Sequence, residues 1–167
     1  MSKFSGGCRP RTWMRLAGIA MALAATSSAA HAAGNFVPAS ACEALNGRGG
    51  ENIWHSFHGL QNLSNDVVQV ICPVVRPSGS AMGATLWVNG SVSANVTMGC
   101  VLTSTSYDGA VTASKSFAVT GAANGSKFDK QLTLSDADAP YYSYQSLICE
   151  LPQNKKGLLR GYMVFSN

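Results

Sequence analysis

The sequence predicts an all-β protein: an antiparallel β-sandwich of Greek-key or jelly-roll type, stapled by two disulfides and preceded by a cleavable signal peptide. Three observations support this prediction. Short runs of β-branched and aromatic residues alternate with turns rich in Gly, Asn, Ser and Pro, which is typical of a sandwich. Helical periodicity is almost absent. An even number of cysteines follows the leader, which indicates disulfides in an exported chain.

The N-terminal segment has the three parts of an export signal. Four basic residues precede an apolar stretch from Leu16 to Ala25, and Ala30-His31-Ala32 supplies the small residues of a cleavage site. The apolar stretch is shorter than the roughly 20 residues that span a bilayer. A retained anchor is the alternative. We expect residues 1–32 to be removed, leaving 33–167 as one secreted or periplasmic domain without a membrane span.

Removal of the leader changes the charge. The whole chain carries a formal charge of +4, but its 8 acidic residues all follow Ala32 and so do only 8 of its 12 basic residues. The mature chain is therefore formally neutral. A neutral chain offers no electrostatic reason to expect nucleic acid or anionic lipid as a partner.

The elements are predicted in order along the chain. A short helical turn at residues 39–46 is capped by Ser40 and ended by Gly47. The strands that follow are predicted at residues 52–60, 67–75, 84–88, 93–104, 110–119, 128–134, 141–151 and 158–165. Asn89-Gly90 and Asp108-Gly109 suit hairpin turns, because their residue types tolerate positive φ. Residues 77–83 and 121–125 are predicted loops.

Two strands show which way their cysteines face. Side chains alternate between the faces of a strand. Cys100 therefore shares a face with Met98 and Leu102, and Cys149 shares a face with Leu147. Both cysteines are predicted to face the core.

The four mature cysteines allow three pairings. Their common orientation favours Cys100–Cys149, which leaves Cys42–Cys72 to tie the N-terminal segment to the second predicted strand. No two of the four have the spacing of a zinc knuckle. Disulfides are therefore favoured over a metal site.

No catalytic residue, metal or cofactor is predicted. His55 and His58 fall on opposite faces of the first predicted strand, so we expect one half-buried and one exposed histidine rather than a shared metal. Asp136 and Asp138 could form a calcium loop, but the Gly and terminal Glu of such loops are missing, which favours a solvated turn. The chain has no G-x-S-x-G or H-E-x-x-H motif. The prediction is that the protein is not an enzyme.

Three aromatic residues are the predicted binding residues. Tyr142 and Tyr144 alternate with the core-facing Leu147 and Cys149, and Trp87 alternates with its apolar neighbours, so all three rings should point outward. Exposed rings can stack on sugars or anchor a protein partner. The alternative is that they cover a sheet edge or pack under loops.

These observations predict a non-catalytic secreted or periplasmic protein that binds a glycan or protein partner. One alternative is a small secreted hydrolase whose paired carboxylates meet only in the fold. Another is an enzyme inhibitor that presents residues 77–83 as a rigid loop.

Several short motifs support the same fold. They are Cys42, the run from Gly59 to Ser64 that leads to Val70-Ile71-Cys72-Pro73, Gly99-Cys100, Cys149-Glu150-Leu151-Pro152, and Gly157. In this order they resemble a diffuse group of small exported bacterial proteins without an assigned function. The resemblance implies a β-sandwich stapled by disulfides, and it supplies no catalytic or binding residue.

Overall fold

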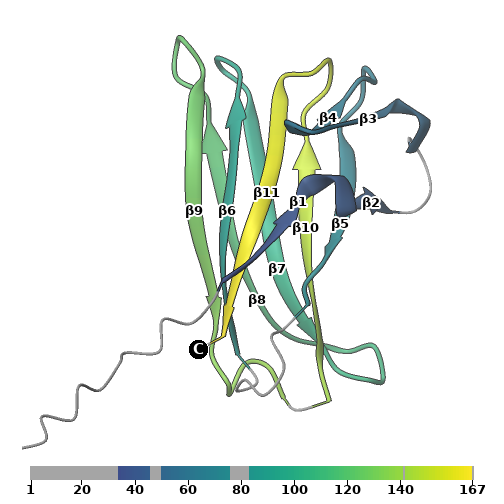
Figure 1. Cartoon of the computed structure of the whole chain (residues 1–167), viewed down its shortest axis with the longest axis vertical. Helices are drawn as coiled ribbons and strands as arrows, with labels where there is room; N and C mark the ends of the chain where they lie inside the picture. The colour runs from purple at the N-terminus through teal and green to yellow at the C-terminus, as the bar shows by residue number, and fades with distance from the viewer. Residues whose placement is uncertain (1–33, 46–49, 76–82, 141, 167) are drawn as a thin grey trace, which may run out of the picture. The chain divides into compact units, whose positions relative to one another are not determined.

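The computed structural model describes residues 34–45, 50–75, 83–140 and 142–166, and the account below concerns these residues. They form a sandwich of two antiparallel sheets (Figure 1). The predicted signal peptide and almost all of the predicted loop at 77–83 lie outside the described residues. No helix in the described part of the chain is long and apolar enough to cross a bilayer.

The first sheet, here called the β6 sheet, has the strand order β3-β4-β11-β6-β9, with β1 also paired to β11. Its strands are β1 (Asn35–Pro38), β3 (Ile53–Ser56), β4 (Gly59–Asn62), β6 (Ala84–Val92), β9 (Ser126–Leu134) and β11 (Gly157–Ser166).

The second sheet, here called the β7 sheet, has the order β2-β5-β10-β7-β8. Its strands are β2 (Glu43–Ala44), β5 (Val68–Pro73), β7 (Thr97–Thr105), β8 (Val111–Thr120) and β10 (Tyr144–Leu151). From β4 onward the chain crosses repeatedly between the sheets, so each sheet combines strands that are distant in the sequence.

The core lies between the sheets and is built by period-two alternation. Met98, Cys100 and Leu102 on β7 are buried, as are Leu147 and Cys149 on β10. Apolar burial of this kind is the main favourable term in folding. The predicted core-facing orientation of Cys100 and Cys149 is confirmed.

Both predicted disulfides are present. Cys100 and Cys149 are direct partners across the β7–β10 pair. Cys42, which follows the 3₁₀ turn η1 (Ala39–Ala41), is bonded to Cys72 on β5. The first bridge joins neighbouring strands of the β7 sheet, and the second holds the N-terminal segment against that sheet.

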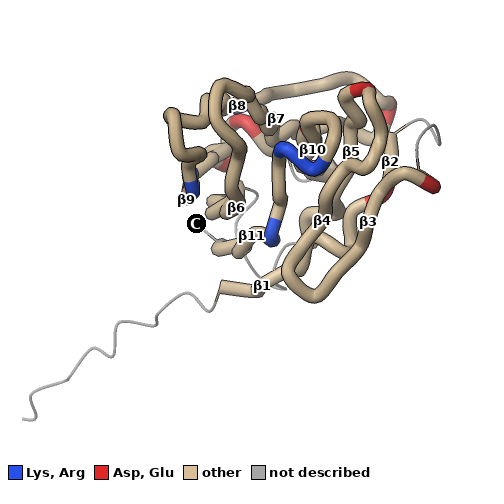
Figure 2. Tube along the Cα trace, turned by 90° about the horizontal axis from the view of Figure 1, so that it is seen from above, with Lys and Arg blue, Asp and Glu red and all other residues tan. Residues whose placement is uncertain are grey.

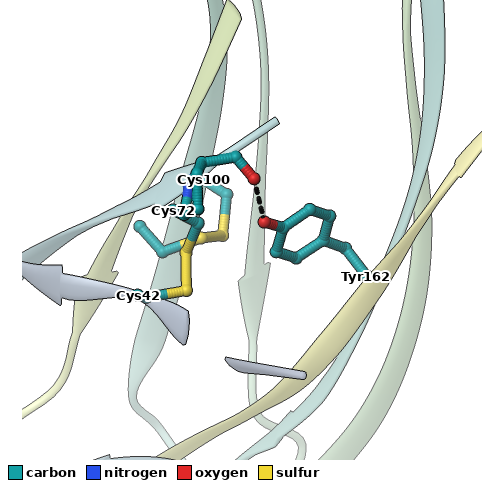
Figure 3. Close-up of a disulfide and its surroundings, with 6 residues drawn as sticks. Cys42, Cys72, Cys100 and Tyr162 are labelled. Atoms are coloured by element: carbon teal, nitrogen blue, oxygen red, sulfur yellow. Dashed lines mark hydrogen bonds between the residues drawn. A yellow bond between two sulfur atoms is a disulfide. The ribbon is translucent and has the colours of Figure 1, made fainter. Parts of the chain in front are cut away.

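A hydrogen bond from a buried tyrosine crosses the core between the two sheets. The hydroxyl of Tyr162 on β11 donates to the backbone carbonyl of Pro73 on β5, next to the bridged Cys72 (Figure 3). The Tyr162 side chain is fully buried. Burial raises its pKa from 10.0 to about 12, because the charged phenolate is poorly solvated there.

Tyr162 should therefore make stability depend on pH in the alkaline range. Its folded-state pKa is raised, so its contribution is fully present below pH 10 and is lost as the pH rises from 10 toward about 12. Tyr162→Phe should lower the free energy of unfolding at pH 7 by about 1 kcal/mol, because one hydrogen bond is lost. It should also flatten the alkaline decline. Urea unfolding of both proteins from pH 8 to 12 measures this, and parallel pH profiles would contradict the assignment.

The first predicted strand, residues 52–60, is wrong in one respect: the chain folds there into a hairpin. β3 and β4 pair with each other, and Phe57 and His58 form the turn. The Ser56 hydroxyl donates to the carbonyl of Gly59 at 3.1 Å and accepts from the His58 N–H at 3.2 Å. Gly59 has φ 135°, a conformation that favours glycine. These local bonds reverse the chain where alternation predicts that it continues.

The predicted hairpin turn at Asn89-Gly90 is also wrong, because β6 runs through it to Val92. Asn89 pairs with Asp129 and Gly90 pairs with Phe128. A Cβ atom at Gly90 would lie 2.4 Å from the carbonyl oxygen of Leu158 and 2.6 Å from the Phe128 ring. The glycine therefore permits close packing inside a sheet rather than a change of direction.

The predicted turn at Asp108-Gly109 is confirmed between β7 and β8. Gly109 has φ 87°, and its N–H donates to the Ser106 carbonyl at 2.9 Å.

The predicted helical turn at residues 39–46 is replaced by η1 and β2. Pro38, not Ser40, occupies the N-cap position, and no side chain caps the turn. The chain then becomes extended, because β2 pairs with β5 beside the Cys42–Cys72 bridge.

Candidate functional site

The outer face of the β6 sheet carries two adjoining hollows. One, of about 530 Å³, is lined on its aromatic side by Phe36, Trp54 and Phe57. The other, of about 460 Å³, is lined by polar and basic residues from β6, β9 and the turn between β10 and β11. Gln61 and Leu158 line both hollows. We treat the two together as one groove, the β6-sheet groove.

The strand register explains how the groove is assembled. Trp54 on β3 lies opposite Gln61 on β4, and Gln61 lies opposite Leu158 on β11. Leu158 lies opposite Ser91 on β6, and Ser91 lies opposite Lys127 on β9. Residues in register point to the same side of a sheet. The five side chains therefore form one row, which begins at a tryptophan and ends at a lysine.

The aromatic end of the groove exposes large apolar rings. Phe36 is 58% exposed, Trp54 48% and Phe57 94%. The Phe57 and His58 rings lie 3.8 Å apart at the tip of the β3–β4 hairpin. Clustered exposed rings of this kind are typical of interaction surfaces.

Phe36 is held at this end by the close approach of β1 to β11. A Cβ atom at Gly161 would lie 2.8 Å from Cζ of Phe36 and 2.7 Å from the Val37 carbonyl oxygen. Only glycine leaves room for the ring at this position. The close packing of β1 against β11 therefore determines where the Phe36 ring lies.

The other end of the groove is basic. Lys127, Lys155 and Lys156 line it, and Arg160 lines the aromatic half. Figure 2, in which Lys and Arg are blue, shows basic positions on β9, on β11 and in the loop between β10 and β11. Nζ of Lys155 lies 5.8 Å from the centre of the Trp54 ring, within the range of a cation–π contact. This contact joins the basic and aromatic halves.

The structure does not bring the three predicted binding residues together. Trp87 lies on β6, and its register partners Met163 and Gln131 are on β11 and β9, so it lies on the outer face of the β6 sheet beside the groove. Tyr142 and Tyr144 are exposed, as predicted, but Tyr144 begins β10 of the other sheet.

Tyr144 lines a separate hollow of about 430 Å³ on the outer face of the β7 sheet. Ile71, Pro73 and Ser146 form part of the same hollow. Tyr144 and Trp87 therefore lie on opposite faces of the sandwich.

Sequence reasoning missed Phe36, Trp54 and Phe57. It predicted no strand at β1 and one unbroken strand over β3 and β4. A signal was nevertheless present, because Trp54 and Phe57 are three residues apart. On a single strand they would point to opposite faces, so one of the two had to face solvent.

The titratable candidates do not form a reactive centre. His55 and His58 are both exposed, so the expectation of one half-buried histidine is wrong. Asp136 accepts a hydrogen bond from the Gly83 N–H at 2.7 Å, and Asp138 accepts one from the Ser135 hydroxyl at 2.9 Å. That hydroxyl is the main reason why the pKa of Asp138 is lowered. The described residues contain no cluster of three or more His, Cys, Asp or Glu suited to a metal ion.

Comparison with known proteins gives few matches. No protein-family model matches the chain, and no curated protein sequence matches it. A xylan-binding module, CBM15, is similar with a TM-score of 0.45 and 11% identity over 80% of this chain and 97% of that one. TmCBM61, solved with β-1,4-galactotriose, has a TM-score of 0.41 and 10% identity over 80% of this chain and 88% of that one. Both are distant similarities of β-sandwich architecture.

Proposed function

We propose that the β6-sheet groove binds an extended polysaccharide and that the protein catalyses no reaction on it. The observation that carries the proposal is the exposure of the Trp54 and Phe57 rings at one end of a groove that also presents polar side chains. Sugar rings present C–H faces that pack against aromatic rings, and their hydroxyl groups need hydrogen-bond partners. Gln61, Asn89 and Ser91 supply amide and hydroxyl groups along the groove.

The absence of acidic groups in the groove supports a binding role. None of the described lining residues of either hollow is Asp or Glu. Glycoside hydrolysis requires two carboxyl groups about 5 to 10 Å apart across the scissile bond. The groove therefore favours a binding module over the hydrolase alternative.

Export is part of the proposal. The two disulfides are of the kind that persists in an oxidising compartment. Together with the signal peptide predicted from the sequence, they favour a periplasmic or extracellular protein, where polysaccharides are available as ligands.

Phe57→Ala is expected to weaken polysaccharide binding about fivefold, which corresponds to about 1 kcal/mol for one stacked ring. Phe57 is 94% exposed, so its removal should leave folding intact. Affinity electrophoresis and calorimetry of the purified protein against a panel of soluble polysaccharides measure the effect. The matched control is Tyr107→Ala, which removes an 84% exposed ring from the β7–β8 turn.

Two results would contradict the proposal. One is unchanged binding by Phe57→Ala together with loss of binding by Tyr144→Ala, which would assign the ligand to the hollow on the β7 sheet. The other is tighter binding of a single-stranded oligonucleotide than of any polysaccharide. Bases also stack on aromatic rings beside cations, so the oligonucleotide is a necessary competitor.

A further inference from the structure

We propose that the ligand of the β6-sheet groove is an acidic polysaccharide, largely neutral along its backbone but carrying uronic acid residues. A carboxylate would bind between Lys127 and Lys156 while neighbouring sugar rings pack on Trp54 and Phe57. This inference rests on the proposed function and adds the chemical class of the ligand.

The first argument is the segregation of charge. Residues 33–167 are formally neutral, yet Lys127, Lys155, Lys156 and Arg160 all line this one groove. In the part of the chain that the structure describes, no carboxylate forms an ion pair with any of them. A groove lined by charges of one sign attracts a ligand of the opposite sign and accelerates its association.

The second argument is that the turn carrying two of these lysines is fixed by the backbone. The Lys155 N–H donates to the Asn62 carbonyl at 2.7 Å, and the Lys156 carbonyl accepts from the Ser93 N–H at 2.7 Å. The Gln61 side chain donates to the Lys155 carbonyl at 3.4 Å. Lys155 has φ 60°, an unfavourable conformation for a lysine. The backbone of the turn is therefore fixed on both sides, and the side chains of Lys155 and Lys156 extend from it to line the groove.

The third argument is the spacing between the two kinds of contact. Trp54 on β3 and Lys127 on β9 end the same row across five strands. Neighbouring strands lie about 4.8 Å apart, so the row is roughly 19 Å long. That length accommodates several sugar rings. A single polysaccharide chain can therefore pack against the aromatic end of the groove and place a charged substituent at the basic end.

The fourth argument selects sparse carboxylates over a dense polyanion. Asp129 is exposed, and it lies two residues from Lys127 on the same face of β9. A polymer with a sulfate on every ring would be repelled by this carboxylate. A mostly neutral chain with separated uronic acids can place its charge beside the lysines and a neutral ring beside Asp129.

The test compares each acidic polysaccharide with its own carboxyl-reduced form, in which the uronic acid has become a neutral sugar on the same backbone. Glucuronoxylan and highly methyl-esterified pectin, which carry separated carboxylates, serve as the sparsely charged probes. Alginate and cellulose sulfate, which can carry a charge on every ring, are the densely charged probes. We expect the wild-type protein to bind at least one sparsely charged form about fivefold more tightly than its reduced form. The preference should shrink between 0.1 and 1 M salt, because the Debye length falls from about 10 Å to 3 Å.

The double variant Lys127→Gln/Lys156→Gln should lose this preference, with about fivefold weaker binding of the acidic form, so that the acidic and reduced forms are bound with similar affinity. The control is Lys115→Gln/Lys130→Gln, which removes the same charge elsewhere. Lys115 lies on β8 of the other sheet, and the register partner of Lys130 is the core residue Val88. This control should keep the preference.

The outcomes separate this inference from the proposed function. Equal binding of acidic and reduced forms would overturn the inference and leave polysaccharide binding standing. Equal effects of the two double variants would also overturn the inference alone. So would a preference for alginate or cellulose sulfate over both sparsely charged polymers. Failure of every polysaccharide to bind would overturn both.

Discussion

Replacing Cys100 and Cys149 together by alanine is expected to lower the free energy of unfolding by roughly 4 kcal/mol. The bridge closes a segment with a sequence separation of 49 residues. In the chain-entropy account, removing such a cross-link gives the unfolded chain this much additional freedom. A small domain typically has only about 5 to 15 kcal/mol of stability in total, so the variant should lose much of it. Urea unfolding without reductant measures the difference.

The second bridge supplies the matched comparison. Cys42→Ala/Cys72→Ala opens a segment with a separation of 30 residues, so its loss should be slightly smaller, roughly 3.7 kcal/mol. Both pairs are buried, which keeps the loss of apolar burial similar in the two variants. Wild-type protein that unfolds at the same urea concentration with and without reductant would contradict the predicted role of both bridges.

Trp54→Ala is expected to weaken polysaccharide binding about 30-fold or more. Truncation of a tryptophan that acts as a binding hot spot costs at least about 2 kcal/mol. Trp54 combines a 48% exposed ring with the contact to Lys155, so the substitution removes a stacking surface and also frees a positioned cation. Calorimetric titration with the best-bound polysaccharide measures the loss.

Trp87→Ala is the control for Trp54→Ala because the residue type, the sheet and the outward direction are the same. Trp87 is 39% exposed and does not line either hollow of the groove. Its replacement should change affinity less than threefold. Equal losses in the two variants would show that the ligand crosses the sheet face beyond the groove. A loss in Trp87→Ala alone would contradict the groove as the binding site.

Local alternation was the most reliable guide to the fold. Leu102, Cys100 and Met98 on one strand, and Leu147 and Cys149 on another, repeat every second residue, and all five are buried as predicted. The same rule failed where local chemistry interrupted it. Ser56 and Gly59 reversed the chain within a predicted strand, and Gly90 continued a strand through a predicted turn.

The candidate site was only partly predictable. Trp87 was correctly expected to face outward, but its relation to the tyrosines depended on which sheet each strand joins. Trp54, Gln61, Leu158, Ser91 and Lys127 lie on five different strands, and no sequence pattern records that these strands are neighbours. The basic character of the groove was hidden for the same reason, because its four basic residues come from β9, from β11 and from the turn between β10 and β11.

By itself, the sequence determined the all-β class and the inward direction of Cys100 and Cys149, and it favoured the cysteine pairing that the structure has. Those properties follow from the steric alternation of side chains along each strand, which acts between near neighbours. Only the tertiary structure decided that the β3–β4 hairpin, which carries Trp54, lies beside the turn between β10 and β11, which carries Lys155. Strand pairing joins residues far apart in the chain, and its outcome depends on how the whole core packs.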